Sequence, residues 1–319
     1  MQGNPRRWGP APAAGSAVTI GVYDGVHRGH QTVLSDLAAR ADQLGVAQRA
    51  VLTFDRHPLA LVAPERAPGL LTTIEQRVEI LESLGVDFVG VLPFDEVRDM
   101  RAAEFIHSVL LHSLGARLVV VGTNFRFGRD REGDVAGLRE EGVRHGFAVD
   151  AVELLHGDRA AVSSSAIRSL LAAGDVERVE EALGRPFELQ GRVVAGDGRG
   201  ATIGFPTANL SFPEGMAVPA RGVYAVRVNH GDRSIPGVSN VGVRPTFGGE
   251  VLTVEVHLLD FTGSLYEGTL GVEFKHRLRD EQKFSGVDEL VTQIHHDVAA
   301  ARRRLAGATE PIETEGRND

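Results

Sequence analysis

The sequence predicts two domains, an α/β domain followed by a small β-barrel with a C-terminal helix. Three observations indicate this. The chain has 319 residues, which is too many for one ordinary core. Its first part alternates short runs of β-branched residues with helical patterns, whereas its last part has short strands with one apolar face and frequent glycine. Because the pattern changes near Gly184, we expect domains at 1–184 and 185–306, then a disordered tail at 307–319.

The strands of the first domain are continuous apolar runs, which are typical of a parallel sheet covered by helices on both faces. Thr73 and Gln76 form a capping box at the start of one helix between them. Gly45 and Gly85 stand where two of the helices should end. The expected strands are 17–23, 50–54, 86–92 and 117–122, and the helix before Gly45 has an apolar face of Val33, Leu34, Leu37, Ala41 and Leu44.

The strands of the second domain alternate between apolar and polar residues. Along 252–259 the even-numbered positions from 254 to 258 are apolar, and Glu255 and His257 lie on the other face. Several such strands at close spacing indicate a small closed barrel. Other strands are expected at 222–228 and 271–278, and the apolar face of the last helix consists of Val287, Leu290, Val291, Ile294 and Val298.

The composition is that of a globular protein and excludes several classes. Hydrophobic residues make up 42% of the chain and charged residues 24%. No apolar run approaches the roughly 18–20 residues that cross a bilayer, so we expect neither a membrane segment nor a signal peptide. The net charge of −9 argues against a nucleic-acid-binding surface. The absence of cysteine excludes disulfides and a cysteine nucleophile, and it favours a cytoplasmic location.

The most informative stretch is 21–30, which runs from the first strand through a glycine-rich turn into a helix. His27 and His30 are three residues apart, so they share a face at the helix start. Their ring donors add to the unsatisfied N–H groups and the partial positive charge of the helix N-terminus. Gly25 and Gly29 leave room for backbone to approach a phosphate. The stretch therefore favours stabilisation of a phosphoryl transition state. The alternative is that the histidines only cap the helix.

Two later segments add candidates for the same site. Residues 124–127 follow a buried strand, and their amide and guanidinium are suited to a ligand site, whereas their two phenylalanines either line that site or belong to the core. Three serines at 163–165 begin a helix, where capping is their ordinary role. Arg168 adds a charge that capping does not require.

A second constellation lies in the barrel domain. Gly196 and Gly198 belong to a flexible, glycine-rich arch. Thr207 and Asn209 alternate on a strand, so both point to one side and offer oxygen ligands for a Mg²⁺ that bridges ATP phosphates. Glu255 is either a solvated glutamate on an exposed strand face or the base that phosphorylation of an alcohol requires.

The segments of the first domain resemble the bacterial FAD synthetase family. The family motif GxFDGxHxGH matches 21–30 with Tyr23 in place of phenylalanine, FxFG matches 125–128, and SSTxIR matches 163–168 with Ser165 in place of threonine. The resemblance implies a Rossmann-like HxGH nucleotidyltransferase domain, in which the phosphate of FMN attacks the α-phosphate of ATP and pyrophosphate leaves. It implies catalytic roles for His27 and His30, ATP contacts at Gly21, Asp24, Gly29, Ser164 and Arg168, and flavin contacts at Asn124, Phe125, Arg126 and Phe127.

The barrel domain resembles the riboflavin kinases, whose GFPTAN signature stands at 204–209, and the resemblance extends from Phe187 to about Leu305. It implies a six-stranded antiparallel barrel that phosphorylates riboflavin, with Glu255 as general base on the 5′-hydroxyl. Ala201 departs from the family, which often has a basic residue there, and this puts one ATP-phosphate contact in doubt. The implied ligands are Mg²⁺ at Thr207 and Asn209, ATP at those residues and at Gly196 and Gly198, and flavin at Arg244, Arg279 and Phe284.

Together these resemblances imply an enzyme that converts riboflavin to FMN and FMN to FAD, with ATP as co-substrate and Mg²⁺ as metal. Its partners would be these small molecules. Two alternatives stay open. Either only one domain is active, or the protein is a flavin-binding regulator without catalysis. The HxGH pair alone does not choose the acceptor of the adenylyl group, but the kinase domain beside it makes FMN the natural choice.

Overall fold

The computed structural model describes residues 8, 11–153, 162–196, 198–246, 249–263 and 268–306. The tail expected at 307–319 lies outside these residues. The chain forms two compact units, Met1–Ile167 and Arg168–Asp319. None of the described helices is long and apolar enough to cross a lipid bilayer.

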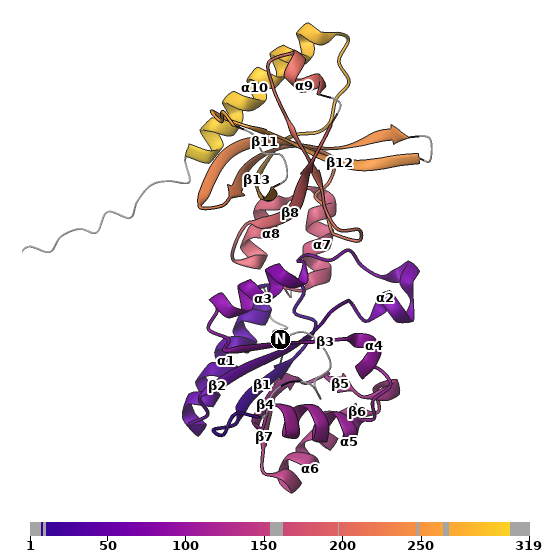
Figure 1. Ribbon diagram of the computed structural model, residues 1–319, viewed down its shortest axis with the longest axis vertical. Helices are drawn as coiled ribbons and strands as arrows, with labels where there is room; N and C mark the ends of the chain where they lie inside the picture. Colours follow the sequence, from indigo (N-terminus) through magenta and orange to yellow (C-terminus); the bar gives the residue numbers. More distant parts are fainter. Residues whose placement is uncertain are drawn as a thin grey trace, which may run out of the picture. The chain divides into compact units, whose positions relative to one another are not determined.

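A five-stranded parallel sheet in the order β3-β2-β1-β4-β7 forms the centre of the first unit (Figure 1). Four of its strands were expected. The fifth, β7, escaped the sequence pattern because it is an edge strand, half-buried at most positions, with Asp150 at its middle. The strands are β1 (Ser16–Ile20), β2 (Gln48–Phe54), β3 (Phe88–Leu92), β4 (Ala116–Gly122) and β7 (Ala148–Val152).

Helices cover both faces of this sheet, as the continuous apolar runs predicted (Figure 1). Neighbouring residues of β1 enter different cores. Ala17 packs with the helix α1, whereas Val18 packs with the helices on the opposite face. α1 (Arg28–Leu44) and α3 (Ile74–Ser83) cover one face, and α5 (Ala102–Phe105), the π-helix η3 (Ile106–Ser113) and α6 (Val135–His145) cover the other. Shorter elements are α2 (Leu59–Val62), η2 (Pro64–Arg66), α4 (Phe94–Val97), β5 (Arg126–Phe127), η4 (Arg129–Arg131) and β6 (Gly133–Asp134).

The expected helix ends are confirmed, and one expected core residue is wrong. The capping box of Thr73 and Gln76 has both of its hydrogen bonds, at 3.1 and 3.0 Å. Gly45 follows α1 with φ 66°, a left-handed conformation that glycine adopts without strain. Leu44, assigned to the apolar face of α1, is 56% exposed and is the last residue of the helix.

The second unit is a closed antiparallel barrel in the order β10-β11-β12-β9-β8-β13, and this confirms the expected six strands. The strand β8 extends to Val194, so the first part of the expected arch at 191–200 is regular structure, and the helical turn α9 begins at Arg199. The strands are β8 (Phe187–Val194), β9 (Ala208–Ser211), β10 (Gly222–His230), β11 (Arg233–Thr246), β12 (Gly249–Leu258) and β13 (Thr269–Arg279), and the helices are α7 (Ser164–Ala173), α8 (Val176–Leu183), α9 (Arg199–Thr202) and α10 (Val287–Ala306).

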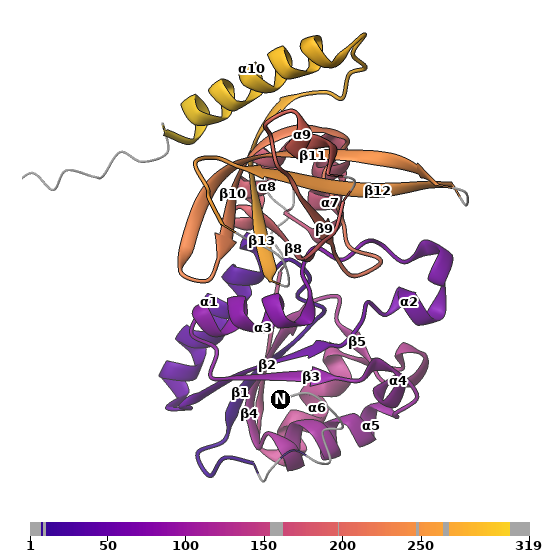
Figure 2. The same ribbon diagram turned by 45° about the horizontal axis from the view of Figure 1, so that its top comes forward.

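The last helix, α10, lies across the barrel in both views (Figures 1 and 2). Ala301 and Leu305 pack against Ala225 of β10, with Val238 and Leu278 beside them. Val287 of the expected apolar face is exposed, since it occupies the first helical turn. The helix α8 packs on the barrel as well, through an ion pair of Glu180 with Lys275 (2.8 Å) and a hydrogen bond between Glu177 and Nδ1 of His276 (3.2 Å). By its packing, α8 therefore belongs with the barrel.

Candidate functional site

The glycine-rich turn at 21–27 leaves the carboxyl end of β1, at the point where the sheet changes direction. The sheet order places β1 between β2 and β4. The loop after β4, which carries Asn124, therefore begins beside the turn at the same edge of the sheet. In open α/β sheets, ligands bind in the crevice at such a switch point. The first candidate site thus has the position that its fold favours for a ligand.

The turn holds a strained backbone. Tyr23 has φ 52° and Val26 has φ 40°, and Gly25 between them has φ 81°. Residues other than glycine rarely adopt these φ angles, and such strain persists only where the surroundings enforce it. Both side chains are buried, and the hydroxyl of Tyr23 is 2.7 Å from Oγ1 of Thr19. Packing of these two side chains therefore fixes the path of the turn in front of α1.

The two histidines lie face to face at the start of α1. Their ring centroids are 3.7 Å apart and the rings are inclined by 17°. His27 is the N-cap residue, and its Nδ1 accepts a hydrogen bond from the His30 N–H at 3.4 Å. The capping interpretation is thus correct for His27, and the shared face is confirmed. His30 differs, because its buried Nδ1 has no hydrogen-bond partner in the part of the chain that the structure describes.

The environment of His30 disfavours its charged form. Burial, and after it the electrostatic influence of His27 and of the Arg77 guanidinium, holds the pKa of His30 well below its usual 6.5. The imidazole of His30 is therefore neutral at neutral pH. A neutral ring can donate one hydrogen bond to a phosphate oxygen without carrying a charge of its own.

Asp24 joins the turn to the segment before α3. Its buried carboxylate accepts hydrogen bonds from the backbone N–H groups of Leu71 (2.9 Å) and Thr72 (3.2 Å), and it lies 3.6 Å from the buried guanidinium of Arg77. Its main-chain carbonyl accepts a hydrogen bond from the hydroxyl of Ser164 at 2.9 Å. The carboxylate of Asp24 thus positions the turn, and its contact with phosphate stays a prediction.

The segment after β4 divides between core and surface. Phe127 is buried in the core and stacks on Phe125, with ring centroids 5.4 Å apart. Asn124 and Arg126 are exposed, and Arg126 pairs with Asp134 at 3.1 Å. The core interpretation therefore holds for Phe127. Asn124 and Arg126 stay candidates for a ligand contact. On α7, Arg168 is one turn from Ser164 and half-buried.

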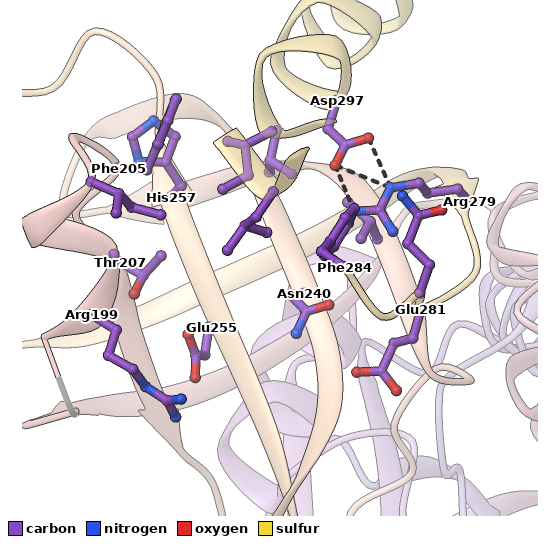
Figure 3. Close-up of a pocket in the computed structure, with 17 residues that line it drawn as sticks. Arg199, Phe205, Thr207, Asn240, Glu255, His257, Arg279, Glu281, Phe284 and Asp297 are labelled. Carbon is purple, nitrogen blue, oxygen red and sulfur yellow. Dashed lines mark hydrogen bonds and ion pairs between the residues drawn. The ribbon is translucent and has the colours of Figure 1, made fainter. Parts of the chain in front are cut away.

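The second candidate site is a cavity of about 410 Å³ on the outer face of the barrel (Figure 3). The inward residues of β12, Val254 and Val256, fill the barrel core, so Glu255 and His257 point out of it. These two side chains are partly exposed, and both line the cavity. The segment from α9 to Thr207 forms one wall, and α10 with the residues after β13 forms another.

Glu255 lies at the centre of a polar group within this cavity. In the sheet register it is opposite Asn209 of β9 on one side and Asn240 of β11 on the other. Its Oε1 is 3.5 Å from the Nη2 of Arg244, and its side chain is 31% exposed. Thr207 lines the same cavity just before β9 begins. The barrel thus brings the predicted base, Glu255, to the two predicted metal ligands, Thr207 and Asn209, from which it is far apart in the sequence.

The opposite side of the cavity is held by an ion pair between β13 and α10. Arg279 donates from Nε and Nη2 to the carboxylate of Asp297, at 2.9 and 2.8 Å, and the side chain of Asp297 is only 6% exposed (Figure 3). Gln293 donates a further hydrogen bond to the same carboxylate at 2.9 Å. The guanidinium of Arg279 also lies 5.8 Å from the ring centroid of Phe284. Two predicted flavin contacts therefore lie side by side.

Comparisons with known proteins match both parts of the chain. The family model described as FAD synthetase matches residues 10–166, and the model described as riboflavin kinase matches residues 183–305. A bifunctional riboflavin kinase/FMN adenylyltransferase of Pseudomonas fluorescens is 44% identical over 92% of this chain and 94% of its own. The chain belongs to the bifunctional riboflavin kinase/FMN adenylyltransferase family.

Further relatives in the bifunctional family carry the same name. The protein of Escherichia coli (strain K12) is 39% identical over 94% of this chain and 96% of its own, and that of Bacillus subtilis (strain 168) is 35% identical over 91% and 92%. A solved structure called a macrolide-efflux protein, from Streptococcus pneumoniae, matches 95% of this chain and 98% of its own with a TM-score of 0.84 and 30% identity. That name describes the other protein, and the likeness supports the fold of the bifunctional family for this chain.

Sequence reasoning missed most of the residues that line the cavity of this family member, among them Arg199, Asn240, Glu281 and Asp297. Arg199 stands two residues before the unusual Ala201 and lines the wall beside Thr207. Its position in the glycine-rich arch was the only available signal. Asn240 and Glu281 line it as well, but neither carried a chemical signal in the sequence. Asp297 resembled an ordinary solvated carboxylate on a helix, because only the fold brings it to Arg279.

Proposed function

We propose that the barrel unit phosphorylates riboflavin to FMN and that the α/β unit transfers an adenylyl group from ATP to FMN, giving FAD and pyrophosphate. The observation that carries this proposal is the grouping of Thr207, Asn209 and Glu255 on the outer face of the barrel. A non-catalytic flavin-binding protein would have no need of an oriented carboxylate beside these hydroxyl and amide groups. The proposal includes a boundary between the functional domains near Gly184 and a cytoplasmic location.

In the kinase reaction, Glu255 acts as general base. The 5′-hydroxyl oxygen of riboflavin forms a bond to the γ-phosphorus of ATP, the bond from that phosphorus to the ADP oxygen breaks, and the hydroxyl proton passes to the carboxylate. Arg244, 3.5 Å from this carboxylate, keeps it oriented. Asn209 and Asn240 flank it in the register and limit its rotation. Removing a general base of this kind typically slows a reaction by roughly a hundredfold to ten-thousandfold.

Arg279 and Phe284 border the flavin end of the same cavity. The aromatic ring of Phe284 offers a face to the isoalloxazine ring system, and the hydrogen bonds of Arg279 to Asp297 hold the guanidinium beside it. Thr207 lines the ATP end, and the family resemblance assigns Gly196 and Gly198 to ATP as well. A Cβ at Gly196 would clash with Nδ2 of Asn209, so glycine lets the backbone pass close to that side chain.

The residues at the ATP end fit Mg²⁺. The hydroxyl of Thr207 and the amide oxygen of Asn209 are hard oxygen ligands, and the carboxylate of Glu255 is opposite Asn209 in the register. When bound there, Mg²⁺ would neutralise charge on the ATP phosphates. Arg199 supplies a positive charge on the same wall, and this compensates for the missing basic residue at Ala201.

In the adenylyl transfer, His27 and His30 contact the phosphates of ATP. An oxygen of the FMN phosphate forms a bond to the α-phosphorus, and the bond from that phosphorus to the bridging oxygen of the β-phosphate breaks. No protein nucleophile is required, so the unit acts by orientation and by hydrogen bonds to developing charge. The unpartnered Nδ1 of His30 supports such a contact, since a buried polar atom normally has a partner. Gly21, Gly29, Ser164 and Arg168 complete the ATP side of this proposal. Asn124, Phe125 and Arg126 form its flavin side, with Phe127 in the core behind Phe125.

Product analysis distinguishes this proposal from its two alternatives. Riboflavin with ATP should release ADP, and FMN with ATP should release pyrophosphate, each in proportion to the flavin consumed. Release of only one product would mean that only one unit is active. Flavin binding without release of either would indicate a regulator. ADP reports the kinase reaction and pyrophosphate reports the adenylyl transfer, even where FMN made from riboflavin is adenylylated in turn. Each product therefore tests one site.

A further inference from the structure

A second group of ligand-type side chains lies on the first unit, away from both sites described above. His107, Glu141 and His145 each offer one ligand atom, and these three atoms all lie within 4.8 Å of one another. His107 belongs to the π-helix η3, and the other two belong to α6. None of the three takes part in the reactions proposed for this chain.

The two residues on α6 already stand at the spacing that a metal requires. Nε2 of His145 is 3.3 Å from Oε2 of Glu141, one helical turn before it. Ligand atoms about 2.0–2.2 Å from a tetrahedral ion are separated by roughly 3.3–3.5 Å. Arg144 pairs with the other carboxylate oxygen, Oε1, so Oε2 alone faces His145. An ion can therefore use Oε2 while the ion pair with Arg144 orients the carboxylate.

The third group comes from a separate element, and this sets the cluster apart from an ordinary helix-surface pair. The rings of His107 and His145 are in contact, with centroids 4.7 Å apart and an angle of 80°. His107 lies in a π-helix, a rare form that often marks functional positions. His107 and His145 are exposed, so small rotations of their side chains can bring the ligand atoms to the distances of a bound ion.

The electrostatic setting also favours a cation. His145 ends α6, and a helix C-terminus carries partial negative charge. A neighbouring hollow, which includes Glu141 in its lining, is strongly acidic. Its other carboxylates are Glu104, Glu132, Asp134 and Glu140, against one guanidinium, that of Arg101. The positive charge of Arg144, which pairs with Oε1, repels a bound cation. The same ion pair orients the carboxylate.

We infer that His107, Glu141 and His145 form a binding site for a divalent transition-metal ion, with Zn²⁺ as the best fit. Two imidazoles and one carboxylate suit Zn²⁺ and Co²⁺, whereas Mg²⁺ prefers oxygen ligands alone. Bound metal would join η3 to α6 and stabilise the first unit, since it binds the folded state and the ligand set is dispersed on unfolding.

The test titrates Zn²⁺ and Co²⁺ into the full-length protein after chelator treatment and dialysis. We expect saturable binding of one Zn²⁺ by calorimetry, a visible absorption band with Co²⁺, and a higher melting temperature with Zn²⁺. His145→Ala and, as a second variant, Glu141→Gln should each lower the affinity at least tenfold, because changing even an outer partner of a ligand costs about that much. His112→Ala changes an exposed histidine of the same π-helix and should bind normally.

One further variant separates this site from the glycine-rich turn. His30→Ala should keep the Zn²⁺ affinity, because His30 is not part of the cluster. Absence of saturable binding to the wild-type protein would overturn the inference. So would equal affinity of the wild-type, His145→Ala and Glu141→Gln proteins. Loss of binding in His30→Ala, with binding kept in the other two, would place the metal at the turn and would also overturn it.

Discussion

The imidazole rings of His27 and His30 stack with their centroids 3.7 Å apart at the first turn of α1. His27 is fixed there by its capping hydrogen bond, and the ring centroid of Tyr23 lies 4.8 Å from that of His30. His30 thus contacts two rings, and its buried Nδ1 has no partner among the described residues. A side chain restrained in this way can contact a phosphate without losing further conformational freedom.

Replacing His30 should therefore remove FAD formation and leave the kinase reaction intact. In His30→Ala we expect the rate of adenylyl transfer to fall at least a hundredfold, roughly 3 kcal/mol, as for loss of a transition-state donor. FMN should still accumulate from riboflavin, which serves as the internal control for folding. Loss of both activities in a folded variant would contradict the assignment of separate sites.

The lowered pKa of His30 also predicts how stability depends on pH. Burial holds the folded-state pKa well below 6.5, whereas the unfolded chain titrates near that ordinary value. As the pH falls through about 6.5, the unfolded state takes up a proton that the folded state does not, so stability decreases. Urea unfolding at several pH values should show this decrease in the wild-type protein and a smaller one in His30→Asn. If the free energy of unfolding had the same pH dependence in both proteins, the pKa of His30 would not be lowered in the folded state.

Replacing Glu255 should produce the complementary defect. In Glu255→Gln we expect formation of FMN from riboflavin to fall by roughly a hundredfold or more, since the amide cannot accept the hydroxyl proton. FAD formation from added FMN should continue at the wild-type rate. The amide preserves the size of the side chain, and flavin binding measured by fluorescence should therefore change little. Normal kinase activity in this variant would exclude Glu255 as the base.

Arg199 should serve ATP in the kinase reaction. In Arg199→Ala we expect the KM for ATP to rise by roughly tenfold, about 1.4 kcal/mol, the scale of one charged hydrogen bond. The KM for riboflavin should stay unchanged, because Arg199 borders the other end of the cavity. Arg233→Ala is a matched control, since Arg233 is exposed on the barrel and does not line the cavity. An unchanged KM for ATP would show that Arg199 does not replace the basic residue that this chain lacks at Ala201.

The ion pair between Arg279 and Asp297 should stabilise the barrel and orient the flavin end. In Asp297→Asn we expect a loss of about 2–3 kcal/mol of unfolding free energy, because the partly buried guanidinium loses its charged acceptor. The KM for riboflavin should rise as well. Asp260→Asn breaks an exposed pair with Arg302 and should change neither quantity appreciably. Equal effects of the two variants would mean that burial of Asp297 has no energetic consequence.

The fold could be predicted wherever one pattern dominated a segment. The apolar runs of β1 to β4 and the alternation along β12 are strong signals, and both are confirmed. β7 escaped because an edge strand needs no continuous apolar run, and β8 because its buried Gly191 resembled a loop residue. Leu44 shows the opposite error, since periodicity cannot tell at which residue of a helix burial ends.

The site residues also fall into two groups, those that are close in sequence and those that only the fold brings together. His27 with His30, and Thr207 with Asn209, are close in sequence, so local spacing predicted that each pair acts together. The association of Arg279 with Asp297 depends on where α10 crosses the barrel, which no local pattern encodes. The buried role of Asp24 depends on the loop before α3 in the same way.

The most direct test of two sites in one chain is a time course of flavins by chromatography, with purified protein, riboflavin, ATP and Mg²⁺. We predict that FMN appears first and that FAD follows as FMN is consumed. Accumulation of FMN alone would contradict the role of His27 and His30 in adenylyl transfer. Absence of FMN, with riboflavin still bound to folded protein, would contradict the central claim that the barrel cavity is a kinase site.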